Sequence, residues 1–173
     1  MRIEDTAAII TGGASGLGEA TARQFREAGA QVTLLDRDAE RGRALAEEIG
    51  AGFAETDVTD EASVSAAIAT AKASMGRITA AVNCAGIATG AKVLGRDGPH
   101  PLDAFRHTID INLVGTFNML RLAAEAISKQ DPDPEGARGV IVNTASIAAF
   151  DGQIGQAAYA ASKGGVAALT LPA

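Results

Sequence analysis

The chain has 173 residues, 47% of them hydrophobic, which is enough to bury one sizeable core and predicts a single domain over residues 1–173. Its formal net charge of -6, without a cluster of Lys or Arg, argues against a nucleic-acid surface, which needs concentrated positive charge. Cys84 is the only cysteine, and His100 and His107 lie far from it in the sequence, so neither a disulfide framework nor a usual zinc site is expected.

The amino-terminal segment runs almost at once into a strand-like apolar stretch, which leaves no room for the parts of a signal peptide. No segment is apolar over the length that a membrane span requires. We therefore expect a cytoplasmic protein that does not associate with a membrane, and a reducing compartment suits its single thiol.

Short apolar or β-branched runs alternate with longer amphipathic stretches, a pattern typical of repeated βαβ units. The predicted strands are Ala7–Thr11, Gln31–Asp36, Gly52–Ala54, Ile78–Asn83 and Gly139–Ala145. The predicted helices are Gly16–Ala28, Ala39–Ile49, Glu61–Met75 and Leu102–Lys129, with a last helix beginning near Gln156. The fold class is therefore α/β: a three-layer, Rossmann-like, doubly wound parallel sheet of order 3-2-1-4-5, with a ligand crevice at the carboxyl ends of its strands.

Two segments are predicted to be loops, Thr89–Pro101 and Gln130–Arg138, the second because its Asp-Pro-Asp-Pro-Glu-Gly core favours turns. The chain stops soon after the apolar strand 139–145 and the opening of the helix that follows. Because an open sheet normally covers or extends such an edge, we expect the fold to be truncated here and residues to follow Ala173.

A glycine-rich segment, residues 11–18, joins the first predicted strand to the first predicted helix. Glycines let the backbone approach a pyrophosphate closely, and the helix N-terminus offers free N–H groups. The spacing G-x-x-x-G-x-G differs from the best-known dinucleotide fingerprint, and a plain tight turn is the alternative interpretation. The expected cofactor contacts are Gly12, Ser15, Gly16, Leu17 and Gly18.

Two acidic residues follow strands on the same side of the predicted sheet. Asp36 ends the second strand 18 residues after Gly18, close to the offset at which an acid binds the adenosine ribose hydroxyls of NAD. Its carboxylate would repel the extra phosphate of NADP, although the adjacent Arg37 could receive one. Asp57 follows the third strand and could accept from the adenine amino group, or serve only as a loop or capping acid.

Tyr159 and Lys163 are four residues apart in a predicted helix and therefore project from nearly the same face. A nearby ammonium lowers the pKa of a phenol toward neutrality, which allows the phenol to exchange protons. Tyr159 is the only tyrosine of the chain, and a half-buried Tyr beside a surface Lys is the alternative. The pair predicts acid/base catalysis by Tyr159, with Lys163 as its activator.

Two further polar residues are candidates for the same site. Ser146 follows the fifth strand, where its hydroxyl would bind a substrate carbonyl oxygen, unless it is only a turn serine. Asn112 is a poor helix former inside a predicted helix, and a proton relay through water to Lys163 would give its amide partners. Together with Tyr159 and Lys163 they suit hydride exchange between NAD and an alcohol/carbonyl pair.

With these residues the chain resembles the short-chain dehydrogenase/reductase family over its whole length. The matching motifs are residues 11–18, Asp57-Val58, Asn83-Cys84-Ala85-Gly86, Asn112, Ser146 and Tyr159-Ala-Ala-Ser-Lys163. The resemblance implies that Val58, Asn83, Ala85 and Gly86 also serve the cofactor site, and that Tyr159 and Lys163 contact the cofactor. Cys84 departs from the family pattern, where a second Asn is common.

The segments 81–87, 115–118 and 143–159 resemble the branch of type 2 3-hydroxyacyl-CoA dehydrogenases. This implies NAD-linked oxidation of a 3-hydroxyacyl-CoA, with Ser146, Gln153 and Tyr159 facing the substrate, and association into a homotetramer. An exposed loop amide is the alternative for Gln153. Another alcohol or hydroxysteroid dehydrogenase, or a non-catalytic NAD-binding subunit, remains an alternative, and family members continue for roughly another third of their length.

Overall fold

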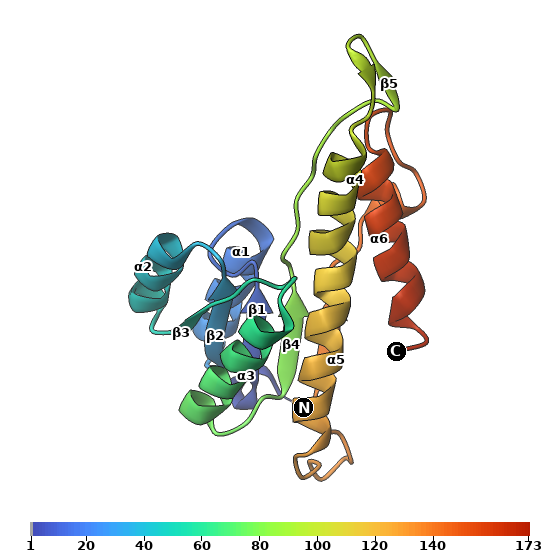
Figure 1. The fold of residues 1–173 in the computed structure, drawn as a ribbon. Helices are drawn as coiled ribbons and strands as arrows, with labels where there is room; N and C mark the ends of the chain where they lie inside the picture. The colour runs from blue at the N-terminus through green and yellow to red at the C-terminus, as the bar shows by residue number, and fades with distance from the viewer. Residues whose placement is uncertain (1) are drawn as a thin grey trace.

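The computed structural model describes residues 2–173, and its centre is a parallel five-stranded sheet. The strands are β1 (Ala7–Thr11), β2 (Gln31–Asp36), β3 (Gly52–Glu55), β4 (Ala80–Asn83) and β7 (Val140–Asn143). They lie in the order β3-β2-β1-β4-β7, and every neighbouring pair is parallel (Figure 1). The predicted order 3-2-1-4-5 is confirmed, with β7 as the fifth strand.

The strand register aligns the carboxyl ends of the central strands. Thr11 at the end of β1 pairs with Leu35 of β2 and with Asn83 of β4, and Asn83 pairs in turn with Asn143 at the end of β7. Since all these strands run in the same direction, the loops that follow them emerge side by side at one edge of the sheet. This edge is where the sequence places the ligand crevice.

Helices cover both faces of the sheet, because successive strand residues point to opposite sides. On one face, α1 (Gly16–Glu27) and α2 (Ala39–Ile49) pack on the strands, and α3 (Glu61–Met75) and α5 (Gly115–Ser128) pack on the other. Each face has its own hydrophobic core. The core under α1 and α2 includes Ile10, Ala22, Leu34 and Leu45, and the core under α3 and α5 includes Ile9, Leu35, Val64 and Met119. Within residues 2–173, no helix combines the length and the apolar character needed to cross a bilayer.

Local side-chain chemistry explains where two of these helices begin and end. Asp38 precedes α2 and accepts a hydrogen bond from the Arg41 N–H, and Asp60 precedes α3 and accepts from the Ala62 N–H. Such acids satisfy N–H groups that have no partner within the helix. Gly50 ends α2 with a φ of 66°, a left-handed conformation that favours glycine.

The predicted helix over residues 102–129 is divided into three consecutive segments. These are α4 (Leu102–Ile109), a π-helical turn η2 (Asp110–Val114) and α5, which together form one continuous rod in Figure 1. Asn112 lies in the π-helical turn, and its side chain hydrogen-bonds the main chain of Ile87 outside the rod. The sequence did not predict the π-helical turn, because this wider turn occurs together with a tertiary contact and has no local sequence signal.

Other differences from the predicted elements are small. β4 begins at Ala80 and not at Ile78, whose N–H donates to the Gln130 side chain, and β7 is shorter than the predicted range 139–145. The predicted loop 89–101 contains a hairpin of β5 (Leu94–Gly95) and β6 (Gly98–Pro99), which projects beyond the sheet in Figure 1. Short 3-10 helices, η1 (Ile3–Asp5) and η3 (Ile147–Ala149), were not predicted.

The last helix, α6 (Ala157–Thr170), begins next to Gln156 as predicted. It packs against α4, η2 and η3, so it lies beside the long rod and close to the end of β7 (Figure 1). This position brings the side chains of its first two turns to the same edge of the sheet as the loops that follow the strands.

Candidate active site

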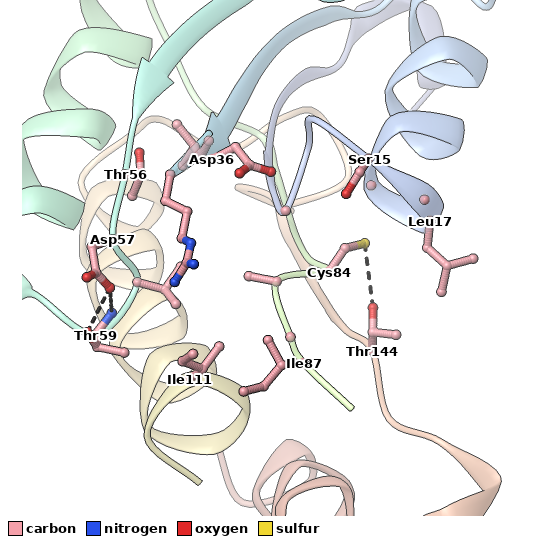
Figure 2. A pocket seen from close by; sticks show the side chains of 18 of the residues that line it. Ser15, Leu17, Asp36, Thr56, Asp57, Thr59, Cys84, Ile87, Ile111 and Thr144 are labelled. Atoms are coloured by element: carbon pink, nitrogen blue, oxygen red, sulfur yellow. Dashed lines mark hydrogen bonds between the residues drawn. The ribbon is translucent and has the colours of Figure 1, made fainter. Parts of the chain in front are cut away.

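A cavity of about 700 Å³ lies at the carboxyl edge of the sheet, within the roughly 300–1,000 Å³ typical of small-molecule and cofactor sites. Figure 2 shows side chains from several loops converging on it. The predicted site residues that line it are Gly12, Ser15, Gly16, Leu17, Gly18, Asp36, Asp57, Val58, Ala85, Gly86, Tyr159 and Lys163. The structure does not place Asn83, Asn112, Ser146 or Gln153 on the cavity wall.

The glycine-rich turn after β1 is packed too closely for side chains at three of its positions, and a Cβ at Gly13 would lie 2.8 Å from the carbonyl oxygen of Ile10. A Cβ at Gly12 would lie 2.9 Å from main-chain atoms of Ala85, and a Cβ at Gly18 would clash with the carbonyl oxygen of Gly12. At Gly16, by contrast, a Cβ would meet only open space. Because the Ser15 side chain makes no capping bond to α1, the first N–H groups of this helix are left for a ligand in the cavity.

Thr11 links this turn to the neighbouring strand end. Its Oγ1 accepts hydrogen bonds from the N–H groups of Cys84 and Ala85, both at 3.1 Å. The loop after β4 is therefore fixed against the loop after β1, which explains why the Ala85 main chain meets Gly12. Because the two loops pack together without side chains at the glycine positions, a ligand phosphate can approach the backbone of the turn closely.

Asp36 lies on the cavity wall beside the glycine-rich turn (Figure 2). One carboxylate oxygen accepts from the Ala14 N–H and the other from the Asp38 N–H, each at 3.0 Å. Each oxygen retains further lone pairs for a ligand, since a carboxylate accepts about four hydrogen bonds. The two backbone contacts hold the carboxylate against the turn, where its charge faces the cavity.

Asp57 lies next to Asp36 along the same edge and is held by its own loop. Its Oδ1 accepts from the N–H of Thr59 at 2.9 Å and from the hydroxyl of Thr59 at 2.7 Å, the dashed lines of Figure 2. The pKa of the Asp57 carboxyl lies below its usual value. The hydrogen bond from the Thr59 hydroxyl contributes most to this lowering, followed by the bond from the Thr59 N–H, and electrostatic interactions with Arg37 and His107 act in the same direction. The carboxylate form is thereby favoured at this position.

Tyr159 and Lys163 lie on α6, which contacts β7, and the strands β1 and β4 separate β7 from β2, where Asp36 lies. The Lys163 Nζ lies 5.9 Å from the centre of the Tyr159 ring and donates to the carbonyl oxygen of Thr144 at 2.6 Å. Burial lowers the pKa of the Lys163 ammonium, and the nearby Cys84 thiol acts in the opposite direction. Both residues line the cavity and the Lys163 Nζ lies over the Tyr159 ring, so the two side chains project from nearly the same face of α6, as their spacing predicts.

Asn112 is fully buried behind this pair, and its amide is used for structure. Its Oδ1 accepts from the Ile87 N–H at 2.8 Å, and its Nδ2 donates to the Ile87 carbonyl at 2.8 Å and to the Ser162 hydroxyl at 3.0 Å. These bonds leave little capacity for the predicted proton relay through the side-chain amide. They instead tie the loop after β4 to α6.

Three other predicted residues lie outside the cavity wall. The Ser146 hydroxyl accepts from the Ala148 N–H at 3.2 Å at the start of η3, and the Gln153 side chain is exposed in the loop before α6. Asn83 is buried inside the sheet, where its amide donates to Asn143 at 2.9 Å. This contact joins the ends of β4 and β7, where Asn83 and Asn143 are paired in the sheet.

A comparison with known protein families shows to which family this chain belongs. The family described as short chain dehydrogenase matches residues 6–172, almost the entire chain. This chain belongs to the short-chain dehydrogenase family. It is therefore an oxidoreductase.

Relatives of this short-chain dehydrogenase are similar over nearly all of its length. Proteins named 3-hydroxyacyl-CoA dehydrogenase type-2 from Homo sapiens and Drosophila melanogaster are each 50% identical to it over 98% of this chain, which covers 67% and 68% of their own lengths. A crystal structure of 3-hydroxyacyl-CoA dehydrogenase type-2 from Mycobacterium avium superposes with a TM-score of 0.92 at 47% identity, covering 98% of this chain and 68% of that one. The chain thus spans about two-thirds of the length of these relatives.

Sequence reasoning missed two residues that position the pair on α6. Ser162 is fully buried, and its hydroxyl donates to the Tyr159 carbonyl at 2.7 Å while accepting from Asn112. Thr144 supplies the carbonyl that Lys163 binds, and its hydroxyl donates to the Cys84 sulfur (Figure 2). Ser162 stands inside the Tyr-Ala-Ala-Ser-Lys motif of this short-chain dehydrogenase, so a signal for it was present. The contact of Thr144 is made by its main chain, which no side-chain pattern indicates.

Proposed function

We propose that this protein is an NAD-dependent oxidoreductase that interconverts a secondary alcohol and a ketone, most specifically a 3-hydroxyacyl-CoA and the 3-oxoacyl-CoA. The observation that carries this proposal is that Tyr159 and Lys163 line the same cavity as the glycine-rich turn and Asp36. One cavity therefore offers a phosphate-binding turn at one end and an acid/base pair at the other.

The shape and chemistry of the cavity suit a dinucleotide. The glycine-rich turn and the N-terminus of α1 would hold the pyrophosphate, and Asp36, Asp57 and Val58 would hold the adenosine half. Ala85 and Gly86 also line the cavity: Ala85 packs against Gly12, and a Cβ at Gly86 would lie 3.8 Å from the Lys163 Nζ. When bound, the nicotinamide ring accepts or donates the hydride.

The chain's own residues would carry the proton. The Tyr159 hydroxyl gives a proton to the carbonyl oxygen during reduction and takes it back from the alcohol during oxidation. We infer that the Lys163 ammonium assists this proton transfer, and its bond to the Thr144 carbonyl holds it in place. Ser146 would orient the substrate oxygen and Gln153 would contribute to the substrate pocket, roles that rest on the family resemblance.

Asp36 supports NAD over NADP as the cofactor. Its carboxylate lies on the cavity wall between two backbone N–H groups, where it would accept from the ribose hydroxyls and repel a 2′-phosphate. Arg37 also lines the cavity and is exposed, and its positive charge is a feature that would favour NADP. Titration of the protein with NAD and with NADP tests the choice, and tighter binding of NADP would contradict it.

The relatives support the proposed substrate, because proteins named 3-hydroxyacyl-CoA dehydrogenase type-2 are 50% identical to this chain. Proteins named L-fucose dehydrogenase are less similar, at 36% identity for the one from Oryctolagus cuniculus. We expect NADH to form from NAD with 3-hydroxybutyryl-CoA and more slowly with L-fucose, simple secondary alcohols or hydroxysteroids. Turnover of one of the latter without any 3-hydroxyacyl-CoA activity would overturn the substrate assignment but not the reaction type.

We also propose that the protein acts as a homotetramer in the cytoplasm. Phe117 on the long rod is 51% exposed, and a large apolar side chain in such a position favours association. The free thiol of Cys84 suits a reducing compartment. Light scattering of the purified protein measures its mass in solution, and a monomer at the concentrations used for activity would contradict the tetramer.

A further inference from the structure

A buried amide on α5 holds the adenosine side of the cavity from behind. Asn118 is 6% exposed, and its Nδ2 donates to the carbonyl oxygen of Val58 at 2.9 Å, although the two residues are 60 positions apart. Val58 stands on the cavity wall in the loop after β3, next to Asp57. The side of this loop that faces away from the cavity is therefore bound to α5.

The amide of Asn118 is itself held in a fixed orientation. Its Oδ1 accepts from the Arg121 guanidinium at 2.8 Å, and Arg121 forms an ion pair of 2.7 Å with Glu61 in the first turn of α3. With Oδ1 committed to a guanidinium, which only donates, Nδ2 is the group that faces Val58. Successive polar contacts therefore link Glu61 to Arg121, Arg121 to Asn118, and Asn118 to the carbonyl oxygen of Val58.

Close packing supports the same contact. A Cβ at Gly115, one turn before Asn118, would lie 2.6 Å from Cγ2 of Val58, so the backbone of α5 approaches the Val58 side chain directly. Val58 is only 8% exposed and belongs to the core cluster shared by α3 and α5. Its side chain and its carbonyl are both fixed by α5, and the loop presents Asp57 and Thr59 to the cavity (Figure 2).

We propose that Asn118 is a positioning residue for the adenosine half of the cofactor, acting through the loop after β3. This inference rests on the proposed dinucleotide binding and adds a residue that lies outside the cavity. Without the Nδ2 donor, the Val58 carbonyl loses its hydrogen bond while it remains buried, and the loop shifts to find another partner. Asp57 and Val58 would then be displaced from the adenosine, whereas the pair on α6 would keep its position.

The chain offers a matched control at the opposite end of the sheet. Gln130 is also a primary amide that donates to a main-chain carbonyl, that of Ile78 at 2.6 Å, and it also accepts from the N–H of Ile78. Asn118→Leu and Gln130→Leu each remove such an amide and leave an apolar side chain of similar size. Only the first removal adjoins the cavity, so a general loss of stability is separated from an effect on binding.

The experiment measures binding to the folded full chain by calorimetry, with NAD, ADP-ribose and nicotinamide mononucleotide as ligands. We expect Asn118→Leu to bind NAD and ADP-ribose about tenfold more weakly, which corresponds to about 1.4 kcal/mol, and to bind the mononucleotide as the wild type does. Gln130→Leu should bind all three ligands like the wild type. Asn118→Asp, which keeps an acceptor for Arg121 but has no donor for Val58, should repeat the selective loss and serves if the Leu variant does not fold.

Two kinds of result overturn the inference. If the wild type binds NAD but both Asn118 variants bind ADP-ribose unchanged, or lose both fragments equally, Asn118 does not position the adenosine half and the proposed function stands. If the wild type binds neither NAD nor ADP-ribose, the proposed cofactor is wrong and this role falls with it. Selective loss of ADP-ribose in the Asn118 variants, absent in Gln130→Leu, supports the role.

Discussion

The two ends of the cavity are built in different ways. At the adenosine end, Asp36 and the glycine-rich turn stand directly at strand ends, and backbone hydrogen bonds from Ala14 and Asp38 hold the carboxylate. At the α6 end, contacts between distant segments hold the helix that carries Tyr159 and Lys163: Asn112 donates to Ser162, and Lys163 donates to the Thr144 carbonyl. Strand register sets the position of Asp36 and of the glycine-rich turn, whereas the pair on α6 is positioned by tertiary hydrogen bonds alone, so substitutions should affect the two ends separately.

The largest effect is expected at the α6 end from Tyr159→Phe. This change removes only the hydroxyl, and loss of a general acid/base residue typically lowers the rate by about 10²–10⁴-fold. NADH formation from 3-hydroxybutyryl-CoA should fall by at least about a hundredfold, while NADH binding, followed by fluorescence, should remain near the wild-type value. Activity within about threefold of the wild type would remove Tyr159 from the proton transfer.

Asp36→Ala tests the adenosine end. It removes the proposed ribose acceptor and the negative charge, so NAD should bind about tenfold more weakly, and the preference for NAD over NADP should decrease. Asp38→Ala is the matched control, because Asp38 is a neighbouring acid that caps α2 and is not on the cavity wall. Equal losses in the two variants, or an unchanged NAD affinity in Asp36→Ala, would argue against the ribose contact.

The sequence allowed the adenosine end to be predicted more completely than the α6 end. Strand order, Asp36 and the glycine-rich turn follow from patterns that repeat along the backbone, and the structure brings them together as expected. The π-helical turn at Asn112 and the contact of Lys163 with Thr144 were not predicted, since both depend on which segments meet in space. For the same reason the placement of Ser146 and Gln153 outside the cavity wall could not be read from their spacing.

A smaller effect is expected from Ser162→Ala, which removes one donor and one acceptor behind Tyr159. The Asn112 amide loses a buried partner, so the free energy of unfolding should fall by about 1–3 kcal/mol. The kcat should decrease severalfold while the KM for NAD stays unchanged, because the adenosine end is not touched. The control is Thr170→Val, which removes a hydroxyl from the far end of α6. A lower affinity for NAD with an unaltered kcat in Ser162→Ala would contradict the separation of the two ends.

The smallest effect concerns acid stability at Asp57. The hydrogen bonds from Thr59 hold the pKa of this carboxyl in the folded protein below the 3.8 of the free group. A depressed folded pKa contributes stability above the unfolded value, and that contribution is lost as pH falls through the folded value. Asp57→Asn should therefore lower the free energy of unfolding near pH 7, by less than about 1 kcal/mol because the carboxyl is exposed to solvent, and the difference from wild type should shrink below about pH 4.

Urea unfolding of Asp57→Asn and wild type at several pH values between neutral and strongly acidic measures this difference. Asp97→Asn is the control, since it removes one carboxylate from the exposed hairpin and so changes the net charge by the same amount. If the two variants differ from wild type in the same way at every pH, the effect reflects net charge alone. If the difference for Asp57→Asn instead grows on acidification, the hydrogen bonds from Thr59 do not favour the carboxylate. Asp57 would then not be a fixed negative charge at the adenosine end in addition to Asp36.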